Sequence, residues 1–99
     1  MYVKTALDQI VRRSENAVWC DLTDEVIVLQ VSTGIYFGLS GVGCAVWHFI
    51  QVPRTLETIL DHLVERYAVE REVCESQTLA FLEDIAKHDL VILSNRDAA

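Results

Sequence analysis

The sequence predicts an α+β domain in which a small antiparallel sheet comes first and three helices follow. Apolar residues change their period once, near residue 40, because short β-branched and aromatic runs precede that point and helical spacings follow it. The chain has 99 residues, 52% of them hydrophobic, which suits one modest core and is too short for two domains. We therefore expect a single domain over residues 1–99, with an ordered core at about residues 17–93.

Three apolar runs predict the strands of the sheet, at residues 17–22, 25–31 and 35–39. Gly34 can adopt the positive φ that closes a hairpin between the second and third runs. The three runs therefore predict an antiparallel meander. Residues 9–12 form either a further strand or an irregular lead-in, and residues 90–93 form either a short terminal strand or an extended tail.

Three helical patterns follow the strands. Ser40 is placed to cap the first helix with its hydroxyl, and this helix ends before Pro53. Thr55 caps the second helix, whose apolar residues recur at helical spacing as far as Tyr67. The third helix covers about residues 70–88. A small sheet followed by three closely connected helices is the outline of a winged helix-turn-helix.

Charge argues against the partners that such a fold often has. Fifteen acidic and eight basic residues give a formal net charge of −7, which disfavours phosphate backbones and anionic membranes. The third helix, which would enter the major groove in a DNA reader, is itself mostly acidic. We therefore expect no nucleic-acid partner and no membrane association. The N-terminus has no export signal and the three cysteines form no disulfide pattern, so we expect a cytoplasmic protein.

No combination of residues predicts catalysis or a metal site. Cys44 and His48 are four residues apart on the first helix, but further ligands at metal-binding spacing are missing. Gly41 and Gly43 lack the third glycine of a nucleotide-binding turn. We expect Gly43 to leave bare backbone for the indole of Trp47 one turn later. The sequence therefore predicts a protein without enzymatic activity, metal or other cofactor.

The third strand offers a different kind of site. If residues 35–39 form a sheet edge beside the third helix, an extended peptide could pair with its backbone. Tyr36 and Phe37 are neighbours and point to opposite faces, so one faces the core and the other faces the groove or solvent.

Several motifs are found together in a known family. They are Val18-Trp19 followed by Asp21-Leu22, the run from Val28 to Ser40, Gly43-x-x-x-Trp47, and Phe81-Leu82-x-x-Ile85 leading to Leu90-Val91-Ile92. With these motifs the chain resembles the PqqD-like proteins, the RiPP recognition elements of ribosomal peptide biosynthesis. Asp89 departs from the pattern, in which glycine often precedes the final leucine.

The resemblance implies a strand-first winged helix-turn-helix that binds the leader segment of a precursor peptide. The leader would pair as an added antiparallel strand with the third strand and lie against the third helix. The implied backbone contacts are Ile35, Tyr36, Phe37, Gly38 and Leu39. The implied helix contacts are Val73, Gln77, Ala80, Phe81 and Asp84.

A stand-alone domain of this length most resembles the leader-binding subunits of lasso peptide pathways. These subunits deliver the precursor to a leader peptidase or another processing enzyme, and a cyclase acts afterwards. The acidic third helix suits a leader that carries Lys or Arg. A second interpretation is an acidic winged-helix transcriptional regulator or a dimerisation module.

Overall fold

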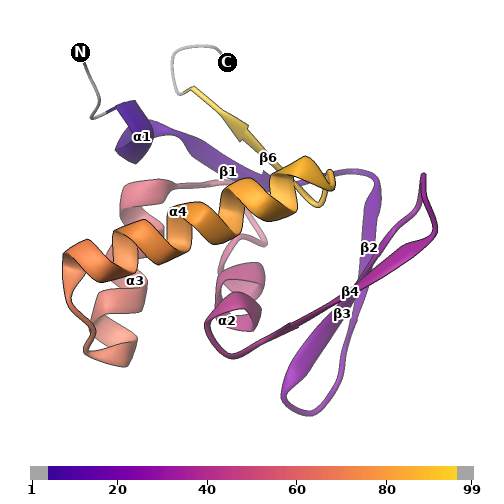
Figure 1. The fold of residues 1–99 in the computed structure, drawn as a ribbon, viewed down its shortest axis with the longest axis horizontal. Coiled ribbons are helices and arrows are strands. Elements are labelled where there is room, and N and C mark those ends of the chain that lie inside the picture. Colours follow the sequence, from indigo (N-terminus) through magenta and orange to yellow (C-terminus); the bar gives the residue numbers. More distant parts are fainter. Residues whose placement is uncertain (1–4, 96–99) are drawn as a thin grey trace.

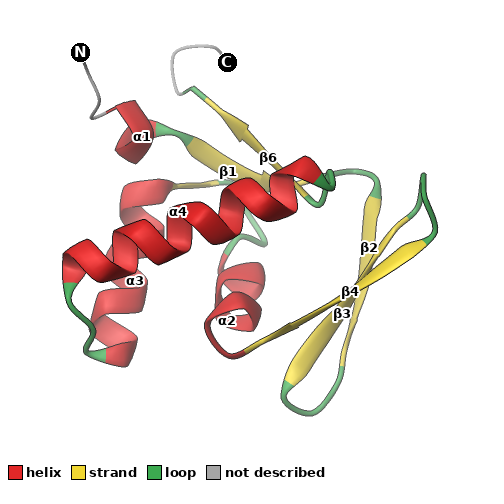
Figure 2. Ribbon diagram, in the orientation of Figure 1, coloured by secondary structure: helices red, strands yellow, loops and turns green. Residues whose placement is uncertain are grey.

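The computed structural model describes residues 5–95, which form a mixed α+β fold with two antiparallel sheets and three helices of nine residues or more (Figure 1). The elements, in chain order, are α1 (Thr5–Asp8), β1 (Ile10–Arg13), β2 (Ala17–Asp21), β3 (Glu25–Gln30), β4 (Ile35–Ser40), α2 (Gly41–Phe49), β5 (Arg54–Thr55), α3 (Leu56–Tyr67), α4 (Arg71–Lys87) and β6 (Val91–Ser94). Figure 2 shows the strands gathered in two groups. None of the helices within residues 5–95 combines the length and the hydrophobicity that crossing a bilayer requires.

The first sheet has the strand order β2-β3-β4 and is the meander that the sequence predicts. Val28 in the middle strand pairs with Trp19 on one side and with Phe37 on the other. Gly34 has a φ of +75°, so its expected role in the second turn is confirmed. In Figure 1 this sheet stands at the right, and α4 runs across the molecule from α3 toward it.

The second sheet, of order β5-β1-β6, was not expected from the sequence as a sheet. Strand β1 pairs with β6 from Ile10↔Ser94 to Arg13↔Val91, so both end segments are strands. Val11 is 1% exposed and belongs to the core, so a core that begins at about residue 17 is wrong. Its partner strand comes from the other end of the chain, and no local pattern reveals such a pairing. Residues 96–99 lie outside the described part.

The helices begin close to where the sequence predicts. Thr55 caps α3, because its side-chain oxygen accepts from the backbone N–H of Thr58 at 3.2 Å. Ser40 occupies the N-cap of α2, but its hydroxyl makes no capping hydrogen bond, so that part of the prediction is wrong. The α2 helix is instead held by the burial of its apolar face, which includes Val46 and Trp47.

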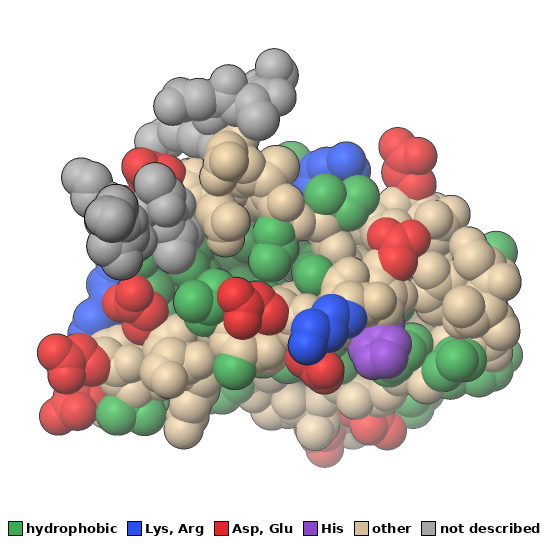
Figure 3. Space-filling view, turned by 45° about the horizontal axis from the view of Figure 1, so that its top comes forward, with side chains coloured by type: hydrophobic (Ala, Val, Ile, Leu, Met, Phe, Trp, Pro, Cys, Tyr) green, Lys and Arg blue, Asp and Glu red, His purple; other side chains and the backbone are tan. Residues whose placement is uncertain are grey.

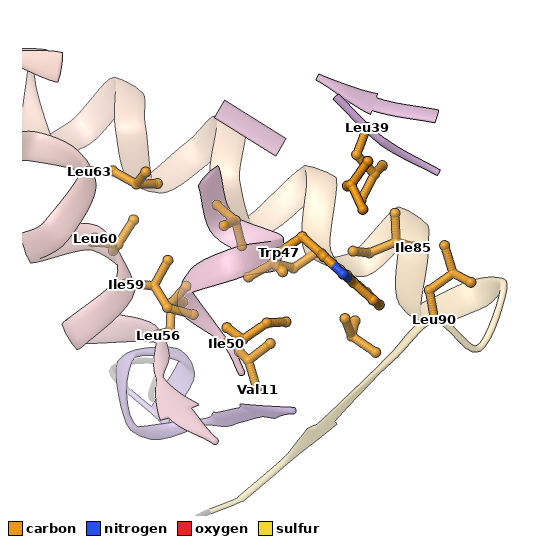
Figure 4. Packing of buried hydrophobic residues seen from close by; sticks show 14 of the residues in the cluster. Val11, Leu39, Trp47, Ile50, Leu56, Ile59, Leu60, Leu63, Ile85 and Leu90 are labelled. Carbon is orange, nitrogen blue, oxygen red and sulfur yellow. The ribbon is translucent and has the colours of Figure 1, made fainter. Parts of the chain in front are cut away.

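The core lies between the helices and the inner faces of both sheets (Figure 4). Trp47, 1% exposed, lies in the middle of the cluster, with Leu39 of β4 and Ile85 of α4 on one side and Ile50 and Leu56 on the other. This packing fixes β4 against α4, because both contribute side chains to the same cluster.

Arg13 connects the two sheets through the same tryptophan. Its guanidinium donates to the backbone oxygen of Trp47 at 2.6 Å and lies over the rings of Trp19 and Trp47, at 4.6 and 4.7 Å from their centroids. The contacts tie β1 to both β2 and α2. The relative placement of the two sheets is therefore set by the contacts of one partly buried side chain as well as by the core.

Candidate functional site

Strand β4 is an edge of the first sheet within the described chain. It pairs with β3 on one side only, from Gln30↔Ile35 to Glu25↔Ser40. An edge strand keeps half of its backbone N–H and C=O groups available for another strand.

The hydrogen bonds at both ends of β3 show which groups these are. The Leu22 N–H donates to the Glu25 carbonyl at 2.8 Å, and the Val31 N–H donates to the Asn16 carbonyl at 2.8 Å. Residues 25 and 31 therefore bond toward β2. Because bonding direction alternates along a strand, the residues of β3 that bond toward β4 are Val26, Val28 and Gln30.

Their partners on β4 use their backbone groups inside the sheet. These partners are Ile35, Phe37 and Leu39. The N–H and C=O groups of Tyr36 and Gly38 must then point to the free edge. Of the five expected contacts on this strand, only these two can offer backbone hydrogen bonds to an added strand, and the other three can offer side chains.

Side chains on the inner face of β4 become more buried from Ile35 through Phe37 to Leu39. Leu39 is 7% exposed and joins the core, whereas Ile35 and Tyr36 are 51% and 69% exposed. Phe37 is half-buried, and its ring lies 4.9 Å from the ring of His88 at the end of α4. Of the neighbours Tyr36 and Phe37, it is therefore Phe37 that faces the helix and Tyr36 that faces solvent.

Helix α4 presents one face to this edge. Val73, Gln77, Phe81 and His88 are separated by four or seven residues and so share a face of the helix. The Phe37–His88 contact shows that this face points toward β4. We refer to the strip of surface between β4 and this face of α4 as the groove, and the Phe37 and His88 rings lie at one end of it.

The remaining two expected helix contacts, Ala80 and Asp84, lie on the same face, because they are seven residues from Val73 and Gln77 respectively. Both are exposed, and neither lines the pocket described next.

An apolar pocket of about 230 Å³ lies between α2, α3 and α4, and its walls include Val42 and Gly43, which follow the Ser40 end of β4. Three of the expected residues, Val73, Gln77 and Phe81, line it. Its other walls come from α2, α3, the α3–α4 connection and the buried side of α4, and they are Val42, Gly43, Val46, Leu63, Tyr67, Val69, Cys74 and Thr78. None of these residues was expected at the site from the sequence. Val42 and Val69 are 45% and 41% exposed. Apolar residues in a sequence are normally interpreted as core, so nothing in the pattern indicates that these two valines lie exposed beside a pocket.

Gly43 lies against a different aromatic ring from the expected one. A β-carbon at this position would lie 3.2 Å from two ring atoms of Phe81, which is closer than ordinary contact. The ring that needs bare backbone therefore belongs to α4 and not to Trp47. The close approach of α2 and α4 sets the position of Phe81 in the pocket wall.

Charge around the groove is mainly negative. Figure 3 shows acidic side chains scattered over this side of the molecule, with hydrophobic side chains exposed between them. Arg71, one of the two basic residues of α4, is paired with Asp61 at 2.6 Å, and this hydrogen bond raises the pKa of Arg71. Asp84, which is exposed, adds a carboxylate on the face of α4 that carries Gln77.

The candidate ligand pair Cys44 and His48 is placed with Asp21. The Cys44 sulfur lies 3.8 Å from His48 Nδ1, and His48 Nε2 lies 2.6 Å from Asp21 Oδ1. The two ring nitrogens face different partners, so the three side chains do not surround one point. Among residues 5–95 no group of three or more His, Cys, Asp or Glu side chains could hold a metal ion.

Comparison with known proteins gives two matches. The profile of the family described as coenzyme PQQ synthesis protein D (PqqD) matches residues 25–91. A solved structure, TbiB1 in complex with the TbiA(beta) leader peptide, matches with a TM-score of 0.77 and 32% identity, covering 81% of this chain and 93% of that one. No curated protein sequence matches.

Proposed function

The chain belongs to the PqqD family, and from this we propose that it binds the leader segment of a ribosomally made precursor peptide by β-strand addition. The observation that carries the proposal is the free edge of β4 beside the apolar pocket on α4. The similar structure TbiB1 is itself a complex with a leader peptide. Edge pairing supplies affinity without regard to sequence, and pockets for side chains supply the selectivity.

The geometry suggests how the leader lies. An added antiparallel strand would run from the Ser40 end of β4 toward Ile35. The pocket is at the Ser40 end, so it would receive a side chain from the N-terminal part of the bound segment. Its lining is largely hydrophobic, which favours an apolar residue there, and Asp84 at the rim favours Lys or Arg on the outer side.

A second surface suits the presentation of the bound leader to a processing enzyme. On the outer face of the first sheet, Val18, Leu29 and Tyr36 form one cross-strand row, and Val18 and Tyr36 are 49% and 69% exposed. A strand added to β4 would extend this apolar face without interruption. We assign it to a leader peptidase of a lasso peptide pathway, which would contact the sheet and the outward side chains of the leader together.

The proposal also covers the class of fold, the role of the chain and its location in the cell. The sheet β2-β3-β4 and helices α2 to α4 correspond to a winged helix-turn-helix in which the strands come first. The chain acts as a single non-catalytic domain that raises the local concentration of precursor beside its enzyme, in the cytoplasm.

Direct binding tests the proposal. A fluorescein-labelled leader peptide, from the precursor gene beside the gene of this chain, is titrated with the protein and followed by anisotropy. We expect saturable binding, and a mobility-shift titration with duplex DNA at low salt should show no complex. Tight, salt-sensitive DNA binding without affinity for the leader would instead support the acidic winged-helix regulator.

Presentation needs a separate experiment. Val18→Lys should slow cleavage of the precursor by the partner peptidase and leave the leader dissociation constant unchanged. Val52→Lys is the matched control, because Val52 is 53% exposed and lies in the loop after α2, away from the sheet. Equal cleavage rates for the two variants would contradict the assignment of this face.

A further inference from the structure

Helix α4 ends in a way that its sequence does not favour. The Leu90 N–H donates to the Ile85 carbonyl and the Asp89 N–H donates to the Ala86 carbonyl, each at 3.0 Å, which is the hydrogen-bond pattern of a Schellman motif. The residue after the C-cap of this motif is left-handed and is usually glycine. Here it is Asp89, with a φ of +58°. A side chain kept at a strained position calls for a reason.

The Asp89 carboxylate supplies that reason by joining two other segments. Its Oδ2 atom accepts from Asn16 Nδ2 at 2.8 Å and from Gln30 Nε2 at 3.3 Å. Asn16 lies in the connection between β1 and β2, and Gln30 is the last residue of β3. A single oxygen thus connects the end of α4 to the start of β2 and to the end of the central strand β3.

Gln30 carries the connection on to the start of β4. It is only 5% exposed, and its Oε1 atom accepts from the backbone N–H groups of Ser32 and Thr33 at 2.6 and 3.2 Å. The turn that leads into β4 is therefore held by the same amide that donates to Asp89. Gln30 uses both ends of its side-chain amide in this bridge.

The bridge stands at one end of the groove. His88, whose ring contacts Phe37 of β4, is the residue immediately before Asp89. The spacing between β4 and α4 at this end thus depends on the Asp89–Gln30 hydrogen bond as well as on the ring contact. At the other end of the groove Phe81 packs against Gly43 in the first turn of α2, the helix that follows β4 directly.

We propose that Asp89 is a positioning residue for the leader peptide: its carboxylate, through Gln30, fixes the edge strand β4 at a set distance from α4 before the peptide arrives. The inference rests on the proposed function and adds to it the part of the fold that keeps the groove preformed. A preformed groove binds more tightly because less ordering accompanies binding. Glycine would suit the backbone of this position better, but it would leave the hairpin untethered.

Two substitutions distinguish the effect of the Asp89 carboxylate from the effect of the left-handed backbone at this position. Asp89→Gly keeps the left-handed residue and removes the acceptor. Asp89→Asn tolerates the same conformation and keeps one side-chain oxygen, which can accept from both Asn16 and Gln30 as Oδ2 does now. Ile59→Val, in the core of α3 and away from the groove, is the control for lost stability alone.

The readout is the dissociation constant of the labelled leader peptide at 25 °C, measured beside thermal unfolding. We expect Asp89→Gly to weaken binding roughly tenfold with a midpoint near that of the wild type, because relief of backbone strain offsets the lost hydrogen bonds. Asp89→Asn should bind within about threefold of the wild type, since a neutral acceptor makes a somewhat weaker bond. Ile59→Val should lower the midpoint and leave the dissociation constant unchanged.

Amide hydrogen exchange of the unliganded protein gives a second measurement. In Asp89→Gly the backbone amides of Ser32 and Thr33 should exchange faster than in the wild type, and in Asp89→Asn they should not. Wild-type affinity in Asp89→Gly, or equal weakening in Asp89→Gly and Asp89→Asn, would overturn the inference. Failure of the wild type to bind the leader would instead overturn the proposed function.

Discussion

Replacing Tyr36 by proline tests the assignment of the free edge on β4. The Tyr36 N–H points away from β3, so proline there removes a donor that the native sheet does not use. Proline is accepted on an edge strand in this orientation, and the domain should fold. The matched variant is Tyr36→Ala, which loses the same side chain and keeps the N–H.

The expected difference between the two variants follows from the number of free groups. Along β4 the outward N–H groups of Tyr36 and Gly38 are the central donors for an added strand. Removing one of them costs one backbone hydrogen bond and leaves a carbonyl of the peptide unpaired. A net loss of about 1–2 kcal/mol corresponds to roughly 5- to 30-fold weaker binding.

Anisotropy titration with the leader peptide measures this ratio, and circular dichroism confirms that both variants are folded. Phe37→Pro provides the opposite control, because the Phe37 N–H faces β3 and its loss should unfold the hairpin. If folded Tyr36→Pro bound the leader as tightly as Tyr36→Ala, the leader would not pair with this edge. The proposed mode of binding would then be wrong.

Further predictions concern the pocket and the Cys44 thiol. Val73→Asp should weaken leader binding about tenfold, because the bound leader would desolvate a carboxylate in an apolar pocket. Val52→Asp, at a similarly exposed valine outside the pocket, should bind the leader as the wild type does. Titration of both variants with the labelled leader checks this. Gly43→Ala should change the unfolding free energy by less than about 1 kcal/mol, since better helix propensity offsets the contact with the phenyl ring on α4. The displaced ring should nevertheless reduce leader affinity several-fold, and chemical denaturation and titration of the same variant separate the two effects. Burial, and after it the nearby carboxylates, raises the pKa of the Cys44 thiol. Iodoacetamide should therefore label Cys44 more slowly than the exposed Cys20 between pH 7 and 9. Mass spectrometry that found Cys44 labelled first would contradict this.

Local signals in the sequence were sufficient for most of the elements. The strands β2 to β4 and helices α2 to α4 each have a hydrophobic period of their own, and Thr55 and Gly34 mark a helix start and a turn by their own chemistry. The charge pattern and the family resemblance together predict that a peptide binds at strand β4 and helix α4. The family is confirmed by the profile match.

Sequence periodicity gave less information where two distant segments meet. The pairing of β1 with β6 joins opposite ends of the chain, and four-residue strands carry too few residues for a clear period. The pocket shows the same limitation, because Val42 and Tyr67 become neighbours only when α2 packs against α3. The spacing of Gly43 and Trp47 predicts that the indole needs bare backbone, but the ring that packs against Gly43 is that of Phe81.

By itself the sequence determined the order of strands β2 to β4 and helices α2 to α4, the excess of acidic residues and the family. These properties depend on residue type and on near neighbours along the chain. Only the tertiary structure decided which backbone groups of β4 are free, which side chains enclose the pocket and why Asp89 takes a glycine's place. Each of these properties depends on register and packing between segments that are far apart in sequence. Local periodicity does not encode such contacts, because they form only when the chain folds.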